Sequence, residues 1–133
     1  MSVIVTDGGF GPETYAGVIV PLDAFDGIGG VDLPNDANVM AVFQSVRGAD
    51  MIRIPFPSFA DGRGFTLARR LRQLGYTGRL RAQGHVLSDQ YPHARRCGFD
   101  EVEISDELAT RQPEGHWSGV RHVSYQDRLT TAL

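Results

Sequence analysis

The sequence contains no lysine, because all thirteen of its basic residues are arginine. This absence excludes Schiff-base chemistry, a P-loop lysine and a lysine general base. Most of the arginines fall between residues 51 and 100. A guanidinium stays charged and binds carboxylate, phosphate or sulfate bidentately, so the clustering suggests a local basic patch. Solvated helix faces and a codon bias toward arginine are the alternative explanation.

Cysteine is nearly absent as well, since Cys97 is the only one. A single cysteine forms no internal disulfide and has no resolving partner in the chain, which agrees with a reducing compartment. The flanking arginines would lower the pKa of this thiol, whereas the negative end of a helix would raise it. We expect Cys97 to be buried and inert.

Long apolar runs and cofactor motifs are also missing. No run approaches the roughly 20 residues that span a bilayer, and the N-terminus lacks the features of a signal peptide. We therefore expect a cytoplasmic protein without a membrane partner. The net charge of −3 gives no reason to expect nucleic acid. No metal-ligand spacing and no flavin, nicotinamide, haem or iron–sulfur motif is present, so we expect no metal and no cofactor.

The length of 133 residues predicts one α/β domain, with an N-terminal arm over residues 1–17 and a C-terminal extension over residues 106–133. Apolar runs and turn residues predict strands over residues 18–22, 51–56, 78–83 and 101–105. Helical spacing and capping residues predict helices that begin at Asp36, at Asp61–Gly64, at Asp89 and beyond Asp106. Residues 23–34 and 112–119 are predicted loops, and residues 120–125 a last extended piece.

The predicted strands alternate polar and apolar residues, as Ile52 and Ile54 do with Arg53. Central strands of a doubly wound sheet are apolar on both faces, so the alternation indicates helices on one face only. Because parallel crossovers are right-handed, we expect a mostly parallel sheet of four to five strands, built from βα units and curved like part of a (βα) barrel. A doubly wound open sheet is the alternative. The polar face would be a lumen, a subunit interface or solvent.

The turn Asp61-Gly62-Arg63-Gly64 follows a predicted strand and opens a predicted helix. Parallel α/β folds bind ligands beyond the carboxyl ends of their strands, where helix N-termini offer N–H groups to anions. A cation in the first turn opposes the helix dipole, so Arg63 requires a bound anion or a carboxylate such as Asp61 or Asp89. A tight turn with a structural ion pair is the alternative. The predicted anion-binding residues are Gly62, Arg63, Gly64 and Arg81.

A second turn, residues 84–90, also follows a strand and precedes a helix. His85 is a candidate general acid or base there, and Asp61 would lie on the same rim if the two βα units are adjacent. A loop histidine with a structural hydrogen bond is the alternative, and helix capping explains Asp89 and Gln90. Asp89, Gln90 and Arg53 are also the rim residues that we predict a partner would contact.

Four motifs stand in order between residues 59 and 100: FADGRG, LR-x-LGY-x-G-x-LRA-x-G, V-L-x-DQ and RCGFD. With them the chain resembles the bacterial domain-of-unknown-function family 934, whose members are labelled probable oxidoreductases involved in sulfite reduction. The resemblance covers residues 18–103 and implies a role near sulfite reductase and phosphoadenylylsulfate reductase. His85 departs from the family pattern, which has an aspartate after that glycine. The signature marks Phe59, Asp61, Gly62, Arg63, Gly64, Arg72, Gly75, Arg81, Gly84, Asp89, Gln90, Cys97, Gly98 and Phe99.

Three functions are compatible with these observations. The first is an accessory protein of assimilatory sulfate and sulfite reduction, which binds an oxyanion or one of the two reductases at the strand-end rim. The second is a non-catalytic interaction module that dimerises through the polar sheet face. The third is a small lyase or isomerase on a partial barrel, with His85 or Asp61 as base. The sequence leaves open whether the protein is an enzyme.

Overall fold

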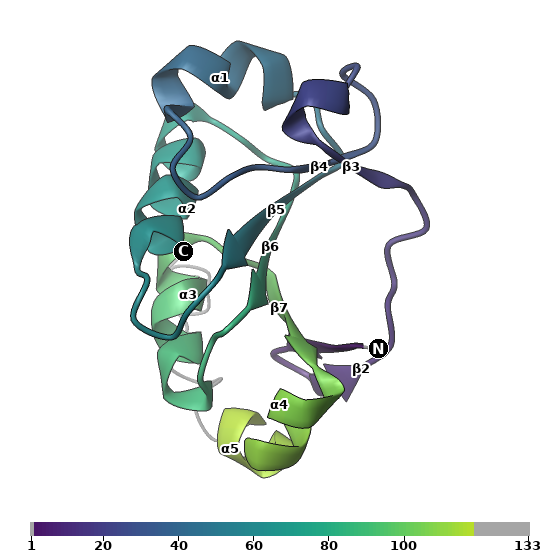
Figure 1. Ribbon diagram of the computed structural model, residues 1–133, viewed down its shortest axis with the longest axis vertical. Helices are drawn as coiled ribbons and strands as arrows, with labels where there is room; N and C mark the ends of the chain where they lie inside the picture. Colours follow the sequence, from purple (N-terminus) through teal and green to yellow (C-terminus); the bar gives the residue numbers. More distant parts are fainter. Residues whose placement is uncertain (1, 119–133) are drawn as a thin grey trace, which may run out of the picture.

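The computed structural model describes residues 2–118, which form one seven-stranded sheet in the order β2-β1-β7-β6-β5-β4-β3 (Figure 1). The strands are β1 (Ser2–Thr6), β2 (Gly9–Gly11), β3 (Ile19–Pro21), β4 (Gly30–Asp32), β5 (Met51–Phe56), β6 (Arg79–Gly84) and β7 (Glu101–Ser105). The helices are α1 (Val39–Val46), α2 (Arg63–Leu74), α3 (Tyr91–Cys97), α4 (Asp106–Arg111) and α5 (Glu114–Ser118), with short 3₁₀ turns η1 (Leu22–Ala24) and η2 (Ser88–Gln90).

The sheet is mixed and mostly parallel. Strands β3 to β7 are parallel and follow in chain order, whereas β1 pairs antiparallel with β7 and with β2. The predicted α/β class is therefore confirmed. The sheet has seven strands instead of four to five, because two strands come from a hairpin and one from a predicted loop, and it is not closed into a barrel.

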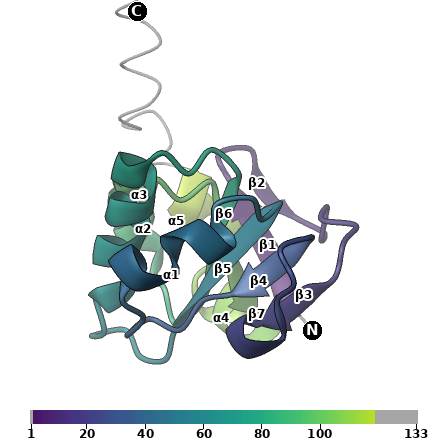
Figure 2. The same ribbon diagram turned by 90° about the horizontal axis from the view of Figure 1, so that it is seen from above.

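Helices α1, α2 and α3 form one layer on one face of the sheet, as both views show (Figures 1 and 2). Each helix connects two successive parallel strands, and right-handed crossovers place such helices on the same side as long as the strand order does not reverse. A doubly wound sheet carries helices on both faces. The single helix layer follows the prediction from strand alternation.

The main core lies between this helix layer and the sheet. Strand β5 directs Ile52, Ile54 and Phe56 into it, and all three are buried. Helix α2 approaches closely because Gly64 has no side chain: a Cβ there would lie 2.6 Å from the Phe56 ring. The aromatic ring of Phe56 also contacts Phe65 at 4.9 Å between centroids. These contacts fix where α2 begins relative to the end of β5.

Two helix ends match their predicted glycines. Gly75 ends α2 with φ of 107°, and Gly98 ends α3 with φ of 113°, the left-handed conformation that glycine adopts most easily. The predicted N-caps are wrong. Helix α1 is capped by Asn38, whose Oδ1 accepts from Ala41 N at 3.3 Å, and not by Asp36. Both residue types cap well, so local sequence did not distinguish them.

The start of α3 also differs from the prediction. Residues Ser88–Gln90 form the 3₁₀ turn η2, and α3 begins after it at Tyr91, so Asp89 is not the N-cap. Gln90 occupies that position, and its side chain accepts from Leu87 N at 2.8 Å. The loop predicted over residues 23–34 contains β4, a strand of three residues that is too short to show alternation.

Both ends of the described chain are more ordered than expected. The predicted N-terminal arm forms the hairpin β1–β2, and Asp7 in its turn accepts from Tyr91 and Arg95 at 2.6 and 3.0 Å. Helix α4 confirms the helix predicted beyond Asp106. The predicted loop over residues 112–119 contains α5, whose buried Trp117 donates to Gln112 O at 2.7 Å. The extended piece predicted over residues 120–125 lies outside the described residues.

Candidate functional site

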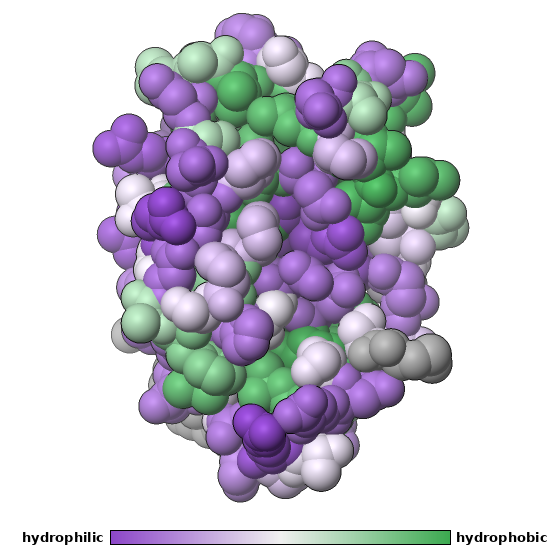
Figure 3. All heavy atoms as spheres, viewed as in Figure 1, coloured by the Kyte–Doolittle hydropathy of each residue, from purple (hydrophilic) through white to green (hydrophobic). Residues whose placement is uncertain are grey.

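A pocket of about 550 Å³ lies at the carboxyl ends of β6 and β7. We call it the strand-end pocket. Helix α4 forms one wall, and Figure 3 shows hydrophobic and hydrophilic surface side by side in this region. Parallel α/β folds bind ligands at this edge of the sheet. Its polar lining includes Ser2, Gln83, His85, Glu103, Ser105 and Arg111.

Gly84 places His85 in the strand-end pocket. Gly84 has φ of 118°, and a Cβ there would lie 2.7 Å from Phe56 O, so only glycine fits this turn. The turn lets His85 N donate to Phe56 O at 2.9 Å. His85 Nδ1 lies 3.2 Å from the same carbonyl, which only accepts, so this contact is a hydrogen bond when Nδ1 carries a proton. Nε2 is then an acceptor, and it becomes a donor only when it is protonated too. The Phe59 ring contacts the imidazole edge-on at 5.0 Å.

Glu103 lines the strand-end pocket but is already neutralised. Its Oε1 accepts from Arg53 Nη1 at 3.1 Å and from Arg81 Nη1 at 2.9 Å. Arg53 also binds both carboxylate oxygens of Asp32, at 2.6 and 2.9 Å. The floor of the pocket therefore presents a carboxylate that is held by two guanidinium groups, which it shares with Asp32, Glu13 and Glu101.

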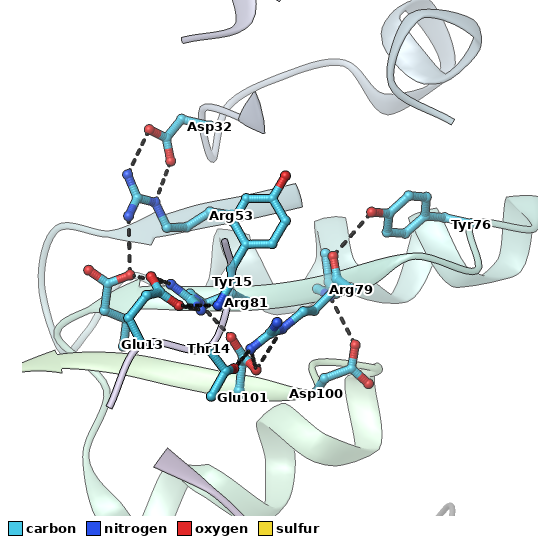
Figure 4. Close-up of polar contacts among 12 residues, drawn as sticks. Glu13, Thr14, Tyr15, Asp32, Arg53, Tyr76, Arg79, Arg81, Asp100 and Glu101 are labelled. Atoms are coloured by element: carbon cyan, nitrogen blue, oxygen red, sulfur yellow. Dashed lines mark hydrogen bonds and ion pairs between the residues drawn. The ribbon is translucent and has the colours of Figure 1, made fainter. Parts of the chain in front are cut away.

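Arg81 is the centre of this polar face and is fully buried. Its Nε donates to Glu101 at 2.5 Å, and its Nη1 and Nη2 donate to Glu13 at 2.7 and 2.5 Å (Figure 4). Burial alone would lower the pKa of the guanidinium, but the hydrogen bonds to Glu13 and Glu101 and the charge of Glu101 raise it above its ordinary value. Every nitrogen of Arg81 contacts a carboxylate, so an additional anion would have to displace one.

The chain itself covers the polar face. The connection from β2 to β3 crosses it and brings Glu13 onto Arg81, Thr14 onto Arg79 and Tyr15 beside them (Figure 4). Arg79 also donates to Glu101 at 2.9 Å. We call the resulting set the arginine–carboxylate layer, which consists of Glu13, Asp32, Arg53, Arg79, Arg81, Glu101 and Glu103. Dimerisation through this face stays a prediction.

The Asp61–Gly64 turn has an internal partner for its cation. Arg63 Nε and Nη2 donate to the two oxygens of Asp61 at 3.0 and 2.8 Å, and Asn35 Nδ2 donates to Asp61 at 3.0 Å. Hydrogen bonds from the Arg63 side chain hold the pKa of Asp61 well below its ordinary value. Asp61 is thus one of the carboxylates that the sequence suggested for Arg63. Anion binding by Gly62, Arg63 and Gly64 stays a prediction.

The two predicted turns lie at the same edge of the sheet but line different pockets. His85 lines the strand-end pocket, whereas Arg63 lines a groove of about 410 Å³ between α1 and α2. Of the predicted partner residues, Arg53 belongs to the arginine–carboxylate layer, and Gln90 joins two loops by donating to Phe59 O at 3.2 Å. Asp89 is exposed in η2.

Ser2 in the strand-end pocket and Glu13 in the arginine–carboxylate layer carry no local signal in the sequence. Ser2 reaches the pocket because β1 runs antiparallel to β7, which pairs Ser2 with Ser105. Glu13 comes from an irregular connection and would not be found by any strand or helix pattern. Glu103 is different, because the alternation of residues 101–105 already placed it on the polar face.

Cys97 is buried, as predicted, in a small groove of about 170 Å³ between α2 and α3. Its Sγ lies 3.5 Å from Arg69 Nη2 and 3.6 Å from His93 Nε2. Burial raises the pKa of the thiol, and the nearby charges of Arg69 and Arg96 oppose this rise only in part. Inertness of Cys97 stays a prediction that agrees with this direction.

Within residues 2–118, three or more histidine, cysteine, aspartate or glutamate side chains nowhere gather as a metal ion would require. In the same range, no helix has the length and apolar composition of a membrane span.

Comparison with known proteins identifies a family. No curated protein matches the chain, and no solved structure does. The family described as "Bacterial protein of unknown function (DUF934)" matches residues 30–132, well over half of the chain. These residues include β5, β6, β7 and the turns that build the strand-end pocket. The chain therefore belongs to this family.

Proposed function

We propose that the protein binds a small oxyanion in the strand-end pocket and acts as an accessory protein of sulfite reduction. The observation that supports the proposal most is that the carboxylates of the pocket already have arginine partners, whereas one histidine nitrogen there has no partner within residues 2–118. Glu103 has Arg53 and Arg81 as partners, and Glu107 has Arg111 at 2.7 Å. His85 Nε2 has no hydrogen-bond partner among the described residues, so an imidazolium with a proton on both ring nitrogens can donate from Nε2 to an oxyanion.

Ser105 adds a second donor. Its Oγ accepts from Leu108 N at 3.1 Å as the N-cap of α4, which leaves the hydroxyl hydrogen to donate. Gln83 and Ser2 line the same pocket and carry further hydrogen-bond donors. The carboxylates of the pocket each contact an arginine, although the arginine–carboxylate layer has three arginines for four carboxylates, so an anion would depend on the hydrogen-bond donors. Sulfite and sulfate are such anions, and the family resemblance associates this chain with their reduction.

The oxyanion proposal is tested by calorimetric titration of the protein with sulfite and with sulfate. His85→Asn keeps a polar side chain but removes the imidazole, and it should weaken binding by roughly tenfold. His85→Asp should abolish binding, because it adds an unpaired carboxylate. Since the family pattern has aspartate at this position, oxyanion binding through His85 is proposed for this chain and not for the whole family. Arg47→Ala, at an exposed arginine of α1, is the control. Loss of binding in Arg63→Ala with full binding in both His85 variants would move the site to the Asp61–Gly64 turn and refute the strand-end proposal.

A lyase or isomerase reaction is the second candidate function, because His85 lines a pocket at the edge where barrel enzymes carry out their chemistry. Asp61 is a poor base for such a reaction, since its pKa is lowered by Arg63 and it lies outside this pocket. We also retain the part-barrel interpretation as a proposal. Consecutive parallel strands, one helix layer and a charged inner face support it.

A further inference from the structure

The outer surface of the helix layer has an unbalanced positive charge. Helices α2 and α3 contain no aspartate or glutamate, although acidic residues outnumber basic ones in the whole chain by 16 to 13. Among the residues that the structure describes, three exposed arginines of these helices form no ion pair with any carboxylate. They are Arg69, Arg70 and Arg96, which we call the arginine face.

One other described arginine also lacks a carboxylate partner: Arg47, which follows α1, donates to Gln44 Oε1 at 3.4 Å and lies over the Phe43 ring. Seven other described arginines each form an ion pair with a carboxylate: Arg53, Arg63, Arg72, Arg79, Arg81, Arg95 and Arg111. Arg95 neighbours Arg96 in sequence, yet it lies on the inner side of α3 and binds Asp7 at 3.0 Å. Three of the four arginines without a carboxylate partner among residues 2–118 thus lie on the two adjacent helices α2 and α3, and the fourth, Arg47, follows α1.

The arginine face surrounds a groove with an apolar floor. Arg69 and Arg70 line the 170 Å³ groove between α2 and α3, together with Phe65, His93 and Cys97. The Phe65 and His93 rings contact each other edge-on at 4.7 Å between centroids. Arg96 directly precedes Cys97, which lines the groove. Burial lowers the pKa of His93, and the charges of Arg96 and Arg69 lower it further.

We propose that the arginine face docks an acidic segment of a partner protein, with carboxylates on Arg69, Arg70 and Arg96 and one apolar side chain in the groove. Charge complementarity favours an acidic protein segment as the partner, because a carboxylate binds a guanidinium bidentately and reduces the repulsion between the three arginines. An apolar floor with an arginine rim also matches the composition of protein interfaces, where arginine and aromatic residues are enriched. The surface is separate from the strand-end pocket and does not depend on oxyanion binding there.

The docking proposal is tested with a defined probe, a fluorescein-labelled peptide of sequence Glu-Glu-Leu-Glu-Glu, whose binding to the full chain is followed by fluorescence anisotropy at low salt. Combined Arg69→Gln, Arg70→Gln and Arg96→Gln changes should weaken binding by roughly tenfold or more. Arg47→Gln, which removes an exposed arginine on α1, should change it less than about twofold. Replacement of the peptide leucine by serine should weaken binding by roughly threefold if the groove takes an apolar side chain.

Four results would overturn the docking proposal: no binding of the peptide, equal binding by the triple variant, an equal loss in Arg47→Gln, or no effect of the leucine. A labelled RNA oligomer of the same charge is a further arm, and tighter RNA binding that the triple variant loses would replace the protein partner by a nucleic acid.

Discussion

The arginines of the sheet face and those of the helix face have the same chemistry but opposite environments. Arg53 and Arg81, on neighbouring strands, are held by carboxylates, and Arg81 has no exposed surface. Arg69 and Arg70, on helix α2, are exposed and have no carboxylate partner among residues 2–118. The difference shows that clustering of arginines in a sequence does not indicate which of them are available to a ligand. The first set holds the fold together, and the second is left for binding.

The largest effect should come from Arg81→Met. Methionine fills part of the space but leaves Glu101 and Glu13 without their central partner in a buried site. Since Arg79 still binds Glu101 and Arg53 still binds Glu103, we expect a loss of about 3 kcal/mol, at the low end for a broken buried pair. Urea unfolding measures it, with Arg70→Met as the helix-face control. A loss below that of the control would show that the arginine–carboxylate layer contributes nothing.

The second effect is a partial rescue. In the Arg81→Met background, Glu101→Gln removes the buried charge that the first change left behind, so the double variant should recover about 1 kcal/mol or more of unfolding free energy. A double-mutant cycle in urea measures the coupling. If the two losses simply add, Arg81 and Glu101 are independent, and the arginine–carboxylate layer is not one network.

The third effect is a pH dependence at the exposed edge of the layer. Hydrogen bonding from Arg81 lowers the folded-state pKa of Glu13 from 4.5 to about 2. Glu13 therefore stabilises the fold fully above pH 4.5, and this stabilisation is lost as the pH falls toward 2. Because the Glu13 side chain is 47% exposed, we expect only about 1 kcal/mol or less. The difference in unfolding free energy between wild type and Glu13→Gln should shrink through this pH window; a constant difference would contradict the pairing.

The smallest effect should come from the helix face. Combined Arg69→Gln, Arg70→Gln and Arg96→Gln changes should alter the unfolding free energy by less than about 0.5 kcal/mol, with a slight gain at low salt as like-charge repulsion is removed. Urea unfolding at low and high salt measures this. A large loss would mean that these arginines have structural partners after all, and would remove the contrast between the two faces.

The local elements of the fold could be predicted from sequence to a large extent. Strand β5 and the glycine ends of α2 and α3 were predicted because alternation, helical spacing and left-handed glycines are properties of neighbouring residues. The single helix layer was predicted because alternating strands leave one face polar. The short strand β4 and helix α5 were missed, since each is too short to show a period.

The candidate site was predicted only in part. His85 was recognised because it follows a strand and a glycine, and the structure places it in the strand-end pocket. Arg63 was also singled out correctly as a cation in need of a partner, but Asp61 two residues away satisfies it. Ser2 and Ser105 were missed as pocket residues because they meet only through antiparallel pairing of the first and last strands of the described chain.

The sequence by itself determined the elements, the polar alternation of the strands and the placement of arginine without acids on α2 and α3. Only the tertiary structure decided which arginines are neutralised. Glu13 binds Arg81 across 68 residues of sequence, and Arg53 binds Glu103 across 50. Such pairs depend on which strands become neighbours and which loop crosses the sheet, and this is decided by packing of the whole chain and not by any local pattern.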